Sequence, residues 1–259
     1  MHTRKTTPVA ITRPISNSII ECELTHLSRS PIDIRKARAE HSAYEQALRD
    51  LGYLVKQLPE ADDLPDGVFV EDCAIVLPEV AILTRPGAAS RRPELTTVKP
   101  VLSEYRKLAF ITAPATMDGG DVLVAGKTIF VGLSQRTNDK GLSQFSGIVT
   151  PLGYKVIGIP LTKCLHLKTA VTCLTADHLL LNPKWVGADL FDDFRITKIH
   201  PDEPFAANVL SIDNRVICSE SCPKTAQIIK DSGFEVVHVD QSELAKAEAG
   251  LTCCSILID

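Results

Sequence analysis

The sequence lacks the features that mark membrane proteins and nucleic-acid-binding proteins. No apolar run approaches the roughly 20 residues that a membrane-spanning helix needs, and residues 1–5 lead into a short apolar stretch without the core of a signal peptide. The 28 basic residues are interspersed with 32 acidic ones and form no block that could follow a phosphate backbone. We therefore expect no membrane and no nucleic acid as partners, and we expect a cytoplasmic protein.

The sequence also lacks the cysteine patterns of a disulfide-rich protein and of a zinc site. The chain has eight cysteines, but disulfide-dense proteins are mostly small secreted domains, so reduced thiols are expected here. Cys218 and Cys222 lie four residues apart and Cys253 and Cys254 are adjacent, yet no second pair and no His-x-x-x-His completes a zinc ligand set. The sequence thus predicts no metal site.

What the sequence does have is a large apolar fraction and an internal repeat. Of its 259 residues 44% are apolar and 23% charged, which suffices for two modest domains or for one large closed architecture. Three segments, at 51–58, 152–159 and 232–239, share a glycine followed by a short strand. Helical spacing before Gly52 indicates that this glycine ends a helix in a left-handed conformation. The repeated unit is therefore helix, glycine and strand.

Pairs of apolar segments around a turn follow these strands and predict β-hairpins. Clear examples run over 68–77 with 80–85 and over 121–124 with 128–132. The first polar residues of the hairpins recur at separations of 49, 45, 42 and 45 residues; they are Asp72, Asp121, His166, Asn208 and Cys253. Five repeats that hide their sheet edges favour closure around an axis, where these residues would meet. The alternative is an ordinary doubly wound fold with chance spacing.

A cysteine, a histidine and carboxylates in one pocket are the parts of a nucleophilic hydrolase. Each candidate also has a plainer interpretation, since Cys253 could be a small buried apolar group and His166 a core histidine. The segment 251–258 is predicted to be an apolar strand, on which neighbouring side chains face opposite ways. Only one of Cys253 and Cys254 can therefore face the pocket.

Charged residues in three short stretches suggest the ligand. The carboxylates are Asp66, Glu71, Asp72, Asp118 and Asp121. Arg85 and Arg136 end their hairpins, where a guanidinium could bind a carboxylate through two parallel hydrogen bonds. Solvated loop carboxylates and surface arginines are the alternatives. A pocket with carboxylates at its floor and arginines at its rim would fit a free amino acid with a guanidinium side chain.

Six stretches carry a resemblance to a known family. They run over 69–72, 82–88, 118–123, 130–138, 165–168 and 251–255. In these stretches the sequence resembles the dimethylarginine dimethylaminohydrolases of the guanidino-group-modifying pentein superfamily. The resemblance implies an α/β fold, a five-bladed α/β propeller with pseudo-fivefold symmetry, formed as one domain over residues 1–259. It implies hydrolysis of asymmetric dimethylarginine or monomethylarginine to citrulline and dimethylamine or methylamine, with no cofactor.

The resemblance also implies roles for single residues. Cys253 would attack the guanidinium carbon and form a covalent thiouronium intermediate, while His166 would serve as general acid and then general base. Asp118, where many relatives have glutamate, would hold the guanidinium together with Asp72. A bound cation beside Cys253 would favour its thiolate, so we expect the substrate to assist the activation of the nucleophile.

The remaining family positions are substrate contacts. Arg85 and Arg136 would bind the α-carboxylate, and Asp66 with the backbone near Leu24 would bind the α-amino group. Phe69 and Glu71 fall in the same pocket, although strict strand alternation would point Glu71 away from it. Residues 25–31 resemble a loop beside the mouth, and zinc bound adventitiously by Cys253 and His166 would inhibit.

Three other functions remain open at this point. An arginine deiminase runs the same chemistry on unmethylated arginine but usually carries an additional helical bundle. A non-catalytic binding module could share the fold, and a cysteine peptidase could use a similar pair of residues. The joint presence of nucleophile, histidine and carboxylates in one register favours the hydrolase. The expected partner is a small molecule, and a homodimer is compatible with the sequence.

Overall fold

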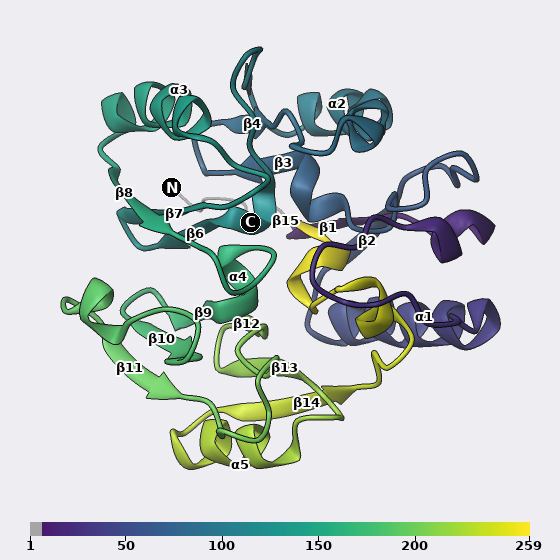
Figure 1. The fold of residues 1–259 in the computed structure, drawn as a ribbon, viewed down its shortest axis with the longest axis vertical. Coiled ribbons are helices and arrows are strands. Elements are labelled where there is room, and N and C mark those ends of the chain that lie inside the picture. Colours follow the sequence, from purple (N-terminus) through teal and green to yellow (C-terminus); the bar gives the residue numbers. More distant parts are fainter. Residues whose placement is uncertain (1–6) are drawn as a thin grey trace.

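The computed structural model describes residues 7–259 and arranges them as five three-stranded sheets around a common axis (Figure 1). In each sheet two strands are antiparallel and a third runs parallel to the middle one. The first sheet has the strand order β15 (Ile256–Ile258), β1 (Val9–Thr12) and β2 (Leu54–Gln57), and the second β3 (Ala74–Val76), β4 (Ala81–Leu83) and β5 (Leu108–Phe110). The third consists of β6 (Val122–Ala125), β7 (Thr128–Leu133) and β8 (Lys155–Pro160), and the fourth of β9 (Val171–Thr175), β10 (His178–Leu181) and β11 (Arg195–Lys198). The fifth consists of β12 (Leu210–Ile212), β13 (Arg215–Ser219) and β14 (Glu235–Val239). This is the five-bladed α/β propeller predicted above, and the doubly wound alternative is wrong.

Helices connect the middle strand of most sheets to its parallel neighbour, because a parallel pair needs a long crossover. They are α1 (Ile34–Asp50), α2 (Leu95–Ser103), α3 (Asp139–Val149) and α5 (Pro223–Asp231), and they lie at the periphery of the ring (Figure 1). In the fourth sheet the crossover contains only the 3₁₀ turn Ala188–Phe191. The short α4 (Leu167–Ala170) instead precedes an inner strand. Within residues 7–259 no helix combines the length and apolar character needed to cross a bilayer.

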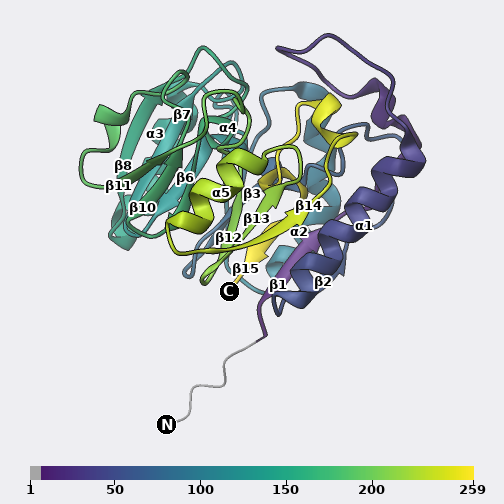
Figure 2. The ribbon, with the colours of Figure 1, turned by 90° about the horizontal axis from the view of Figure 1, so that it is seen from below.

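Both ends of the described chain contribute to one sheet. β1 pairs with β15 in antiparallel register, with Val9 opposite Ile258 and Ile11 opposite Ile256. The C-terminus consequently lies beside β1 and β15 (Figure 2). This pairing closes the ring of sheets and leaves no open end between the first repeat and the last.

The apolar core lies between neighbouring sheets. One cluster, for example, joins Ile82 of β4, Val131 of β7 and Phe145 of α3, all of them buried. Burial of such a side chain is worth about 1.5–3 kcal/mol relative to its exposure. Because each cluster is shared by adjacent repeats, the ring is stabilised by contacts between repeats as well as within them.

The glycines of the sequence repeat adopt the predicted conformation. Gly52, Gly153 and Gly233 have φ angles of +95°, +86° and +97°, in the left-handed region that glycine enters at little cost. Gly52 and Gly233 follow α1 and α5, while Gly153 follows a 3₁₀ turn that contains Pro151. The hairpins predicted over 68–85 and 121–132 are present as β3–β4 and β6–β7.

Two segments predicted as strands begin instead with 3₁₀ turns. Thr252–Cys254 and Val70–Cys73 are single 3₁₀ turns, and the strand after the first is confined to Ile256–Ile258. A third turn of this kind, Gly119–Asp121, precedes β6. Each of these tight turns comes before an inner strand at the axis. Strand alternation therefore does not govern the direction of the polar side chains on the turns.

Candidate active site

The periodic polar residues join neighbouring repeats around the axis. Asp72 accepts a hydrogen bond from the amide of Gly120 at 2.8 Å, and Asp121 accepts one from the amide of Leu167 at 3.0 Å. In both pairs a carboxylate of one repeat satisfies a buried backbone donor of the next, as buried polar groups require. The period in the sequence therefore reflects architecture as well as chemistry.

The same pattern continues through the remaining repeats. Asn208 donates to the carbonyl of Lys168 at 2.9 Å and accepts from the amide of Thr252 at 3.0 Å. The hydroxyl of Thr252 in turn donates to Glu71 at 2.8 Å. A hydrogen-bonded connection thus runs around the whole axis, and Asp72, Asp121 and Asn208 of the predicted set take part in it.

A narrow cleft opens beside this ring. Six predicted site residues line it, namely Asp66, Phe69, Asp72, Arg136, His166 and Cys253. The other lining residues are Glu23, Arg91, Leu165, Ala247, Glu248 and Ala249. The structure brings the candidate nucleophile, the candidate acid and two carboxylates into one cleft, while Leu24, Glu71, Arg85 and Asp118 do not line it.

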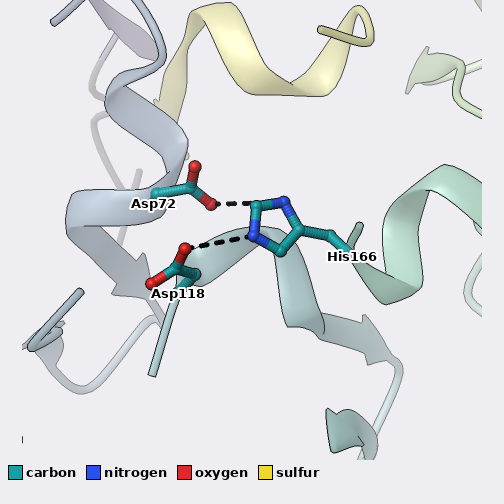
Figure 3. A group of neighbouring side chains, drawn as sticks. All are labelled: Asp72, Asp118 and His166. Atoms are coloured by element: carbon teal, nitrogen blue, oxygen red, sulfur yellow. Dashed lines mark hydrogen bonds and ion pairs between the residues drawn. The ribbon is translucent and has the colours of Figure 1, made fainter. Parts of the chain in front are cut away.

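His166 lies between two carboxylates (Figure 3). Its Nε2 is 3.1 Å from Oδ2 of Asp118 and its Nδ1 is 3.8 Å from Oδ1 of Asp72. Burial alone would lower the pKa of His166, but the charge of Asp72 and the hydrogen bond with Asp118 outweigh it and raise this pKa to about 9. His166 is therefore an imidazolium at neutral pH and has a proton to donate.

Cys253 is half-buried at the cleft and accepts a hydrogen bond from the amide of Gly250, with 3.3 Å between nitrogen and sulfur. Burial, followed by the charges of Glu71 and Asp72, raises the pKa of the Cys253 thiol to about 12. The resting nucleophile is therefore a neutral thiol. Its neighbour Cys254 is 2% exposed and packs in the apolar core, so the two side chains have different surroundings, as predicted.

Asp66 lies at the mouth of the cleft, and both of its carboxylate oxygens accept from the amide of Glu23, at 3.2 and 3.1 Å. Burial raises the pKa of Asp66 to about 6, although the charge of Arg91 opposes this. Leu24 follows Glu23 in the chain and packs against the apolar core with its side chain. Asp66 and the backbone beside Leu24, both predicted to bind the α-amino group, therefore lie next to each other.

Arg91, and not Arg85, lines the cleft. Arg85 donates to the carbonyl of Ala115 at 3.1 Å and does not line the cleft, so the expectation that it faces the substrate pocket is not met. Arg91 is 4% exposed, lines the cleft and forms an ion pair with Glu94 at 2.9 Å and another with Asp72. Its burial depends on contacts that local spacing does not reveal.

Arg91 and His166 together set the charge of Asp72. Burial disfavours the charged carboxylate, but the nearby imidazolium and guanidinium hold the pKa of Asp72 well below its ordinary value. Asp72 is consequently anionic over the whole physiological range and faces the cleft with a permanent negative charge.

Glu71 points to a different space. It forms an ion pair with Lys168, with 2.5 Å between nitrogen and oxygen, and both residues line a cavity of about 250 Å³ along the inner strands. The 3₁₀ turn Val70–Cys73 separates the directions of Glu71 and Asp72. The outcome agrees with the expectation that Glu71 faces away from Asp72, but a turn rather than strand alternation is the reason.

One cluster in the described residues has the composition of a metal site. Asp72, Asp118 and His166 each offer a ligand atom, and these atoms lie within 4.8 Å of one another. The same three groups form a proton-sharing arrangement, in which the imidazolium already supplies the positive charge between the carboxylates. The atoms that could ligate a cation are thus the same atoms that hold the His166 ring between the two carboxylates.

A five-bladed propeller with a thiol, an imidazolium and carboxylates in one cleft defines a cysteine-dependent hydrolase of the pentein superfamily. The family model described as N,N dimethylarginine dimethylhydrolase, eukaryotic, matches residues 25–257. The chain belongs to the dimethylarginine dimethylaminohydrolase family.

Similar proteins include curated enzymes from two bacteria. The N(G),N(G)-dimethylarginine dimethylaminohydrolase of Streptomyces coelicolor is 39% identical over 95% of both chains. That of Pseudomonas aeruginosa is 36% identical over 90% of this chain and 91% of its own. A solved structure of the Pseudomonas enzyme, a cysteine-to-serine mutant complexed with citrulline, has a TM-score of 0.93 and 33% identity over 98% of this chain and 100% of that one.

Proposed function

We propose that this protein hydrolyses ω-N-methylated arginines to citrulline and dimethylamine or methylamine. The observation that carries the proposal is that Cys253 and the protonated His166 share one cleft with the permanently charged Asp72. Membership of the family supports it, and so does a relative of this fold solved as an adduct with S-methyl-L-thiocitrulline.

The charges of the cleft match the three charged groups of a methylated arginine. Asp72 binds the guanidinium at the inner end, and Asp66 attracts the α-ammonium at the mouth. Arg136 lines the cleft, its Nη2 donates to the hydroxyl of Thr25 at 3.1 Å, and it binds the α-carboxylate. Arg91 donates to Asp72, Glu94 and the carbonyl of Phe69, so it holds Asp72 in place for the guanidinium. Opposite charges at both ends of a cleft orient the substrate before reaction.

The first chemical step replaces the methylated amine by sulfur. The cationic substrate beside Cys253 lowers the cost of its thiolate, so the thiol proton is released to solvent and the thiolate attacks the guanidinium carbon to form a C–S bond. His166 donates its proton to the departing nitrogen as the C–N bond breaks, so a neutral amine leaves. Asp118 does not touch the substrate in this scheme, since it holds the His166 ring through Nε2.

The second step hydrolyses the thiouronium intermediate. His166 is now neutral and accepts a proton from a water molecule that attacks the same carbon. The C–S bond then breaks and Cys253 leaves as thiolate, while the added hydroxyl loses its proton to form the carbonyl of citrulline. That proton restores the Cys253 thiol, and His166 keeps the proton it took from water, so both groups return to their resting states. The reaction needs thiol, imidazole and water, and no cofactor takes part in it.

The setting we propose is a single catalytic domain over residues 1–259 that works in the cytoplasm on a small-molecule substrate. All eight cysteines are free thiols, including the nucleophile. A thiol nucleophile without disulfide support fits a reducing compartment.

A turnover assay with two substrates tests the proposal. Purified protein is incubated in parallel with asymmetric dimethylarginine and with arginine, and citrulline, dimethylamine and ammonia are quantified. Citrulline and dimethylamine from the first substrate only support the proposal, whereas ammonia from arginine would assign a deiminase. No product from either substrate would contradict both.

Cysteine variants serve as matched controls. Cys253→Ser is expected to abolish turnover and Cys254→Ser to retain most of it, because the second thiol lies in the core. Equal loss in both variants would contradict the assignment of the nucleophile. Mass spectrometry of a quenched reaction is expected to find the adduct on the peptide that contains Cys253.

A further inference from the structure

Three consecutive backbone amides of an exposed loop converge on one carboxylate. We define the cleft loop as residues 23–31, which precede α1. The amide of Thr25 donates to both carboxylate oxygens of Glu248, at 3.1 and 3.0 Å, and the amides of His26 and Leu27 donate to Oε1. Successive N–H groups of this kind form an anion-binding concavity, here filled by a side chain of the same protein.

The backbone at Glu248 is held in an unusual conformation. Glu248 follows the 3₁₀ helix Leu244–Ala247 and has φ +59° and ψ +18°, in the left-handed region. A residue with a long side chain adopts this conformation at an energetic cost, which glycine would largely avoid. The fold thus tolerates strain at a position where the side chain is engaged with the cleft loop.

Glu248 also lies on the wall of the catalytic cleft. It lines the cleft together with Cys253 and His166, and it lines a neighbouring cavity of about 220 Å³ with His26 and Leu27 of the loop. Two residues further along the chain, the amide of Gly250 donates to the sulfur of Cys253. The carboxylate that holds the loop therefore belongs to the segment that positions the nucleophile.

The loop has further attachments on the cleft side. Arg136, which lines the cleft, donates to the hydroxyl of Thr25 at 3.1 Å, and the amide of Glu23 donates to Asp66. Apart from Leu24 and Thr25, residues 23–30 are exposed. Few apolar contacts hold such a segment, so polar attachments decide its position.

We propose that Glu248 is a positioning residue that latches the cleft loop over the bound substrate through the amides of Thr25, His26 and Leu27. With the latch closed, Thr25 and Glu23 stay beside Arg136 and Asp66, the groups that meet the charged end of the amino acid. With it open, the loop moves away and the substrate leaves. The kinetic part of this inference rests on the proposed function, whereas the structural part does not.

Two variants of Glu248 and one control test the latch. Glu248→Gln keeps the length of the side chain and one acceptor oxygen but removes the charge. Glu248→Gly removes the carboxylate and relieves the left-handed strain, so a loosened loop in this variant cannot come from backbone distortion. Glu235→Gln, at an exposed glutamate on β14, is the matched control.

Hydrogen exchange followed by mass spectrometry gives the first readout. In both Glu248 variants we expect the peptide that contains residues 25–27 to exchange roughly tenfold faster, since hydrogen bonds to a charged group are stronger than average. Peptides of β13 serve as an internal reference and should not change. Unchanged exchange at residues 25–27, or equal acceleration of every peptide, would overturn the proposal.

Steady-state kinetics with asymmetric dimethylarginine give the second readout. A loosened loop is expected to raise KM several-fold, more in Glu248→Gly than in Glu248→Gln, with kcat unchanged or higher where product release limits turnover. An unchanged KM despite faster exchange would refute the latch. Absence of turnover in the wild-type protein would contradict the proposed function, while the exchange experiment would still decide whether Glu248 holds the loop.

Discussion

Asp118 and His166 are 48 residues apart in the chain, yet Oδ2 of the first lies 3.1 Å from Nε2 of the second, with both side chains buried. The separation equals that between Asp72 and Gly120, the hydrogen-bonded pair of the preceding repeat boundary. The same step around the axis therefore builds both a structural contact and the acid–base pair. A repeat that closes a ring brings chemically different residues to equivalent places.

Removing the carboxylate of Asp118 is expected to lower the pKa of His166 from about 9 toward its ordinary value. A raised pKa in the folded state contributes stability below the ordinary value of histidine, and this contribution is lost as the pH rises through about 9. In Asp118→Asn the alkaline limb of kcat/KM should move to lower pH, and kcat should fall by roughly a hundredfold or more. NMR titration of the His166 ring measures the shift directly.

The control for this variant is Asp202→Asn. Asp202 is exposed and lies 3.7 Å from the ring of His200, so its loss removes a carboxylate from a histidine outside the cleft. The titration of His166 should then remain as in the wild type. An unchanged His166 titration in Asp118→Asn would contradict the cause that we give for its raised pKa.

Asp66 is expected to set the acid limb of substrate binding. Since the pKa of Asp66 is raised to about 6, its carboxylate becomes protonated as the pH falls through that value and no longer attracts the α-ammonium. The value of kcat/KM should therefore decrease below about pH 6 in the wild type. Asp66→Asn should have a low kcat/KM without this limb.

The pKa of Asp121 is also raised to about 6, which makes the Asp66 variant decisive. Asp121 is inaccessible and accepts from Ser134 and Thr137, away from the cleft. If the acid limb persisted unchanged in Asp66→Asn, Asp121 or another group would be responsible, and the role of Asp66 in binding the α-amino group would be lost.

Substitutions of Arg91 and of Arg85 should differ in their effect on the stability of the protein. Arg91→Ala leaves Asp72 and Glu94 without their buried partner, which costs about 3–5 kcal/mol of unfolding free energy. Arg85→Ala removes a single hydrogen bond to a carbonyl, worth about 1 kcal/mol. Urea denaturation of the two alanine variants measures both changes in unfolding free energy. In steady-state kinetics of the lysine variants, KM should rise in Arg91→Lys but not in Arg85→Lys. Equal effects of the two alanine variants would reject the distinction.

The repeat was readable from sequence because a glycine precedes the outer strand in three of the five repeats. Gly52, Gly153 and Gly233 occupy left-handed positions that other residues enter at a cost, so their spacing revealed the unit. Asp72, Asp121 and Asn208 keep the same period, since each one bonds to its neighbour around the axis. Local constraints of this kind leave a trace in one chain.

What the sequence could not show is how distant charges share buried space. Arg91 lies on a 3₁₀ helix, Ala89–Glu94, and its role follows from an ion pair with Asp72, a residue 19 positions earlier. Arg85, at the visible end of a hairpin, turns instead to the carbonyl of Ala115. Glu248 was missed for the same reason, because its partners are amides more than 200 residues away. Long-range pairing depends on the closed ring and has no local signal.

Gly120 is expected to be irreplaceable because the candidate acid packs against its backbone. A Cβ at this position would lie 2.5 Å from Nδ1 of His166 and 2.9 Å from Oδ1 of Asp72. In Gly120→Ala the ring must therefore move, which should lower kcat by more than the lost stability explains, about 1–3 kcal/mol for an overpacked site. Activity and urea denaturation measured on the same samples separate the two effects.

Gly147→Ala provides the opposite control. Gly147 lies in α3 on an exposed surface, and a Cβ there would meet no atom within 4 Å. Because alanine is favoured over glycine inside a helix, this variant should be about 1 kcal/mol more stable and fully active. The contrast between the two substitutions isolates the contact of Gly120 with His166: if Gly120→Ala kept wild-type kcat, the ring of His166 would not need the position that the structure gives it.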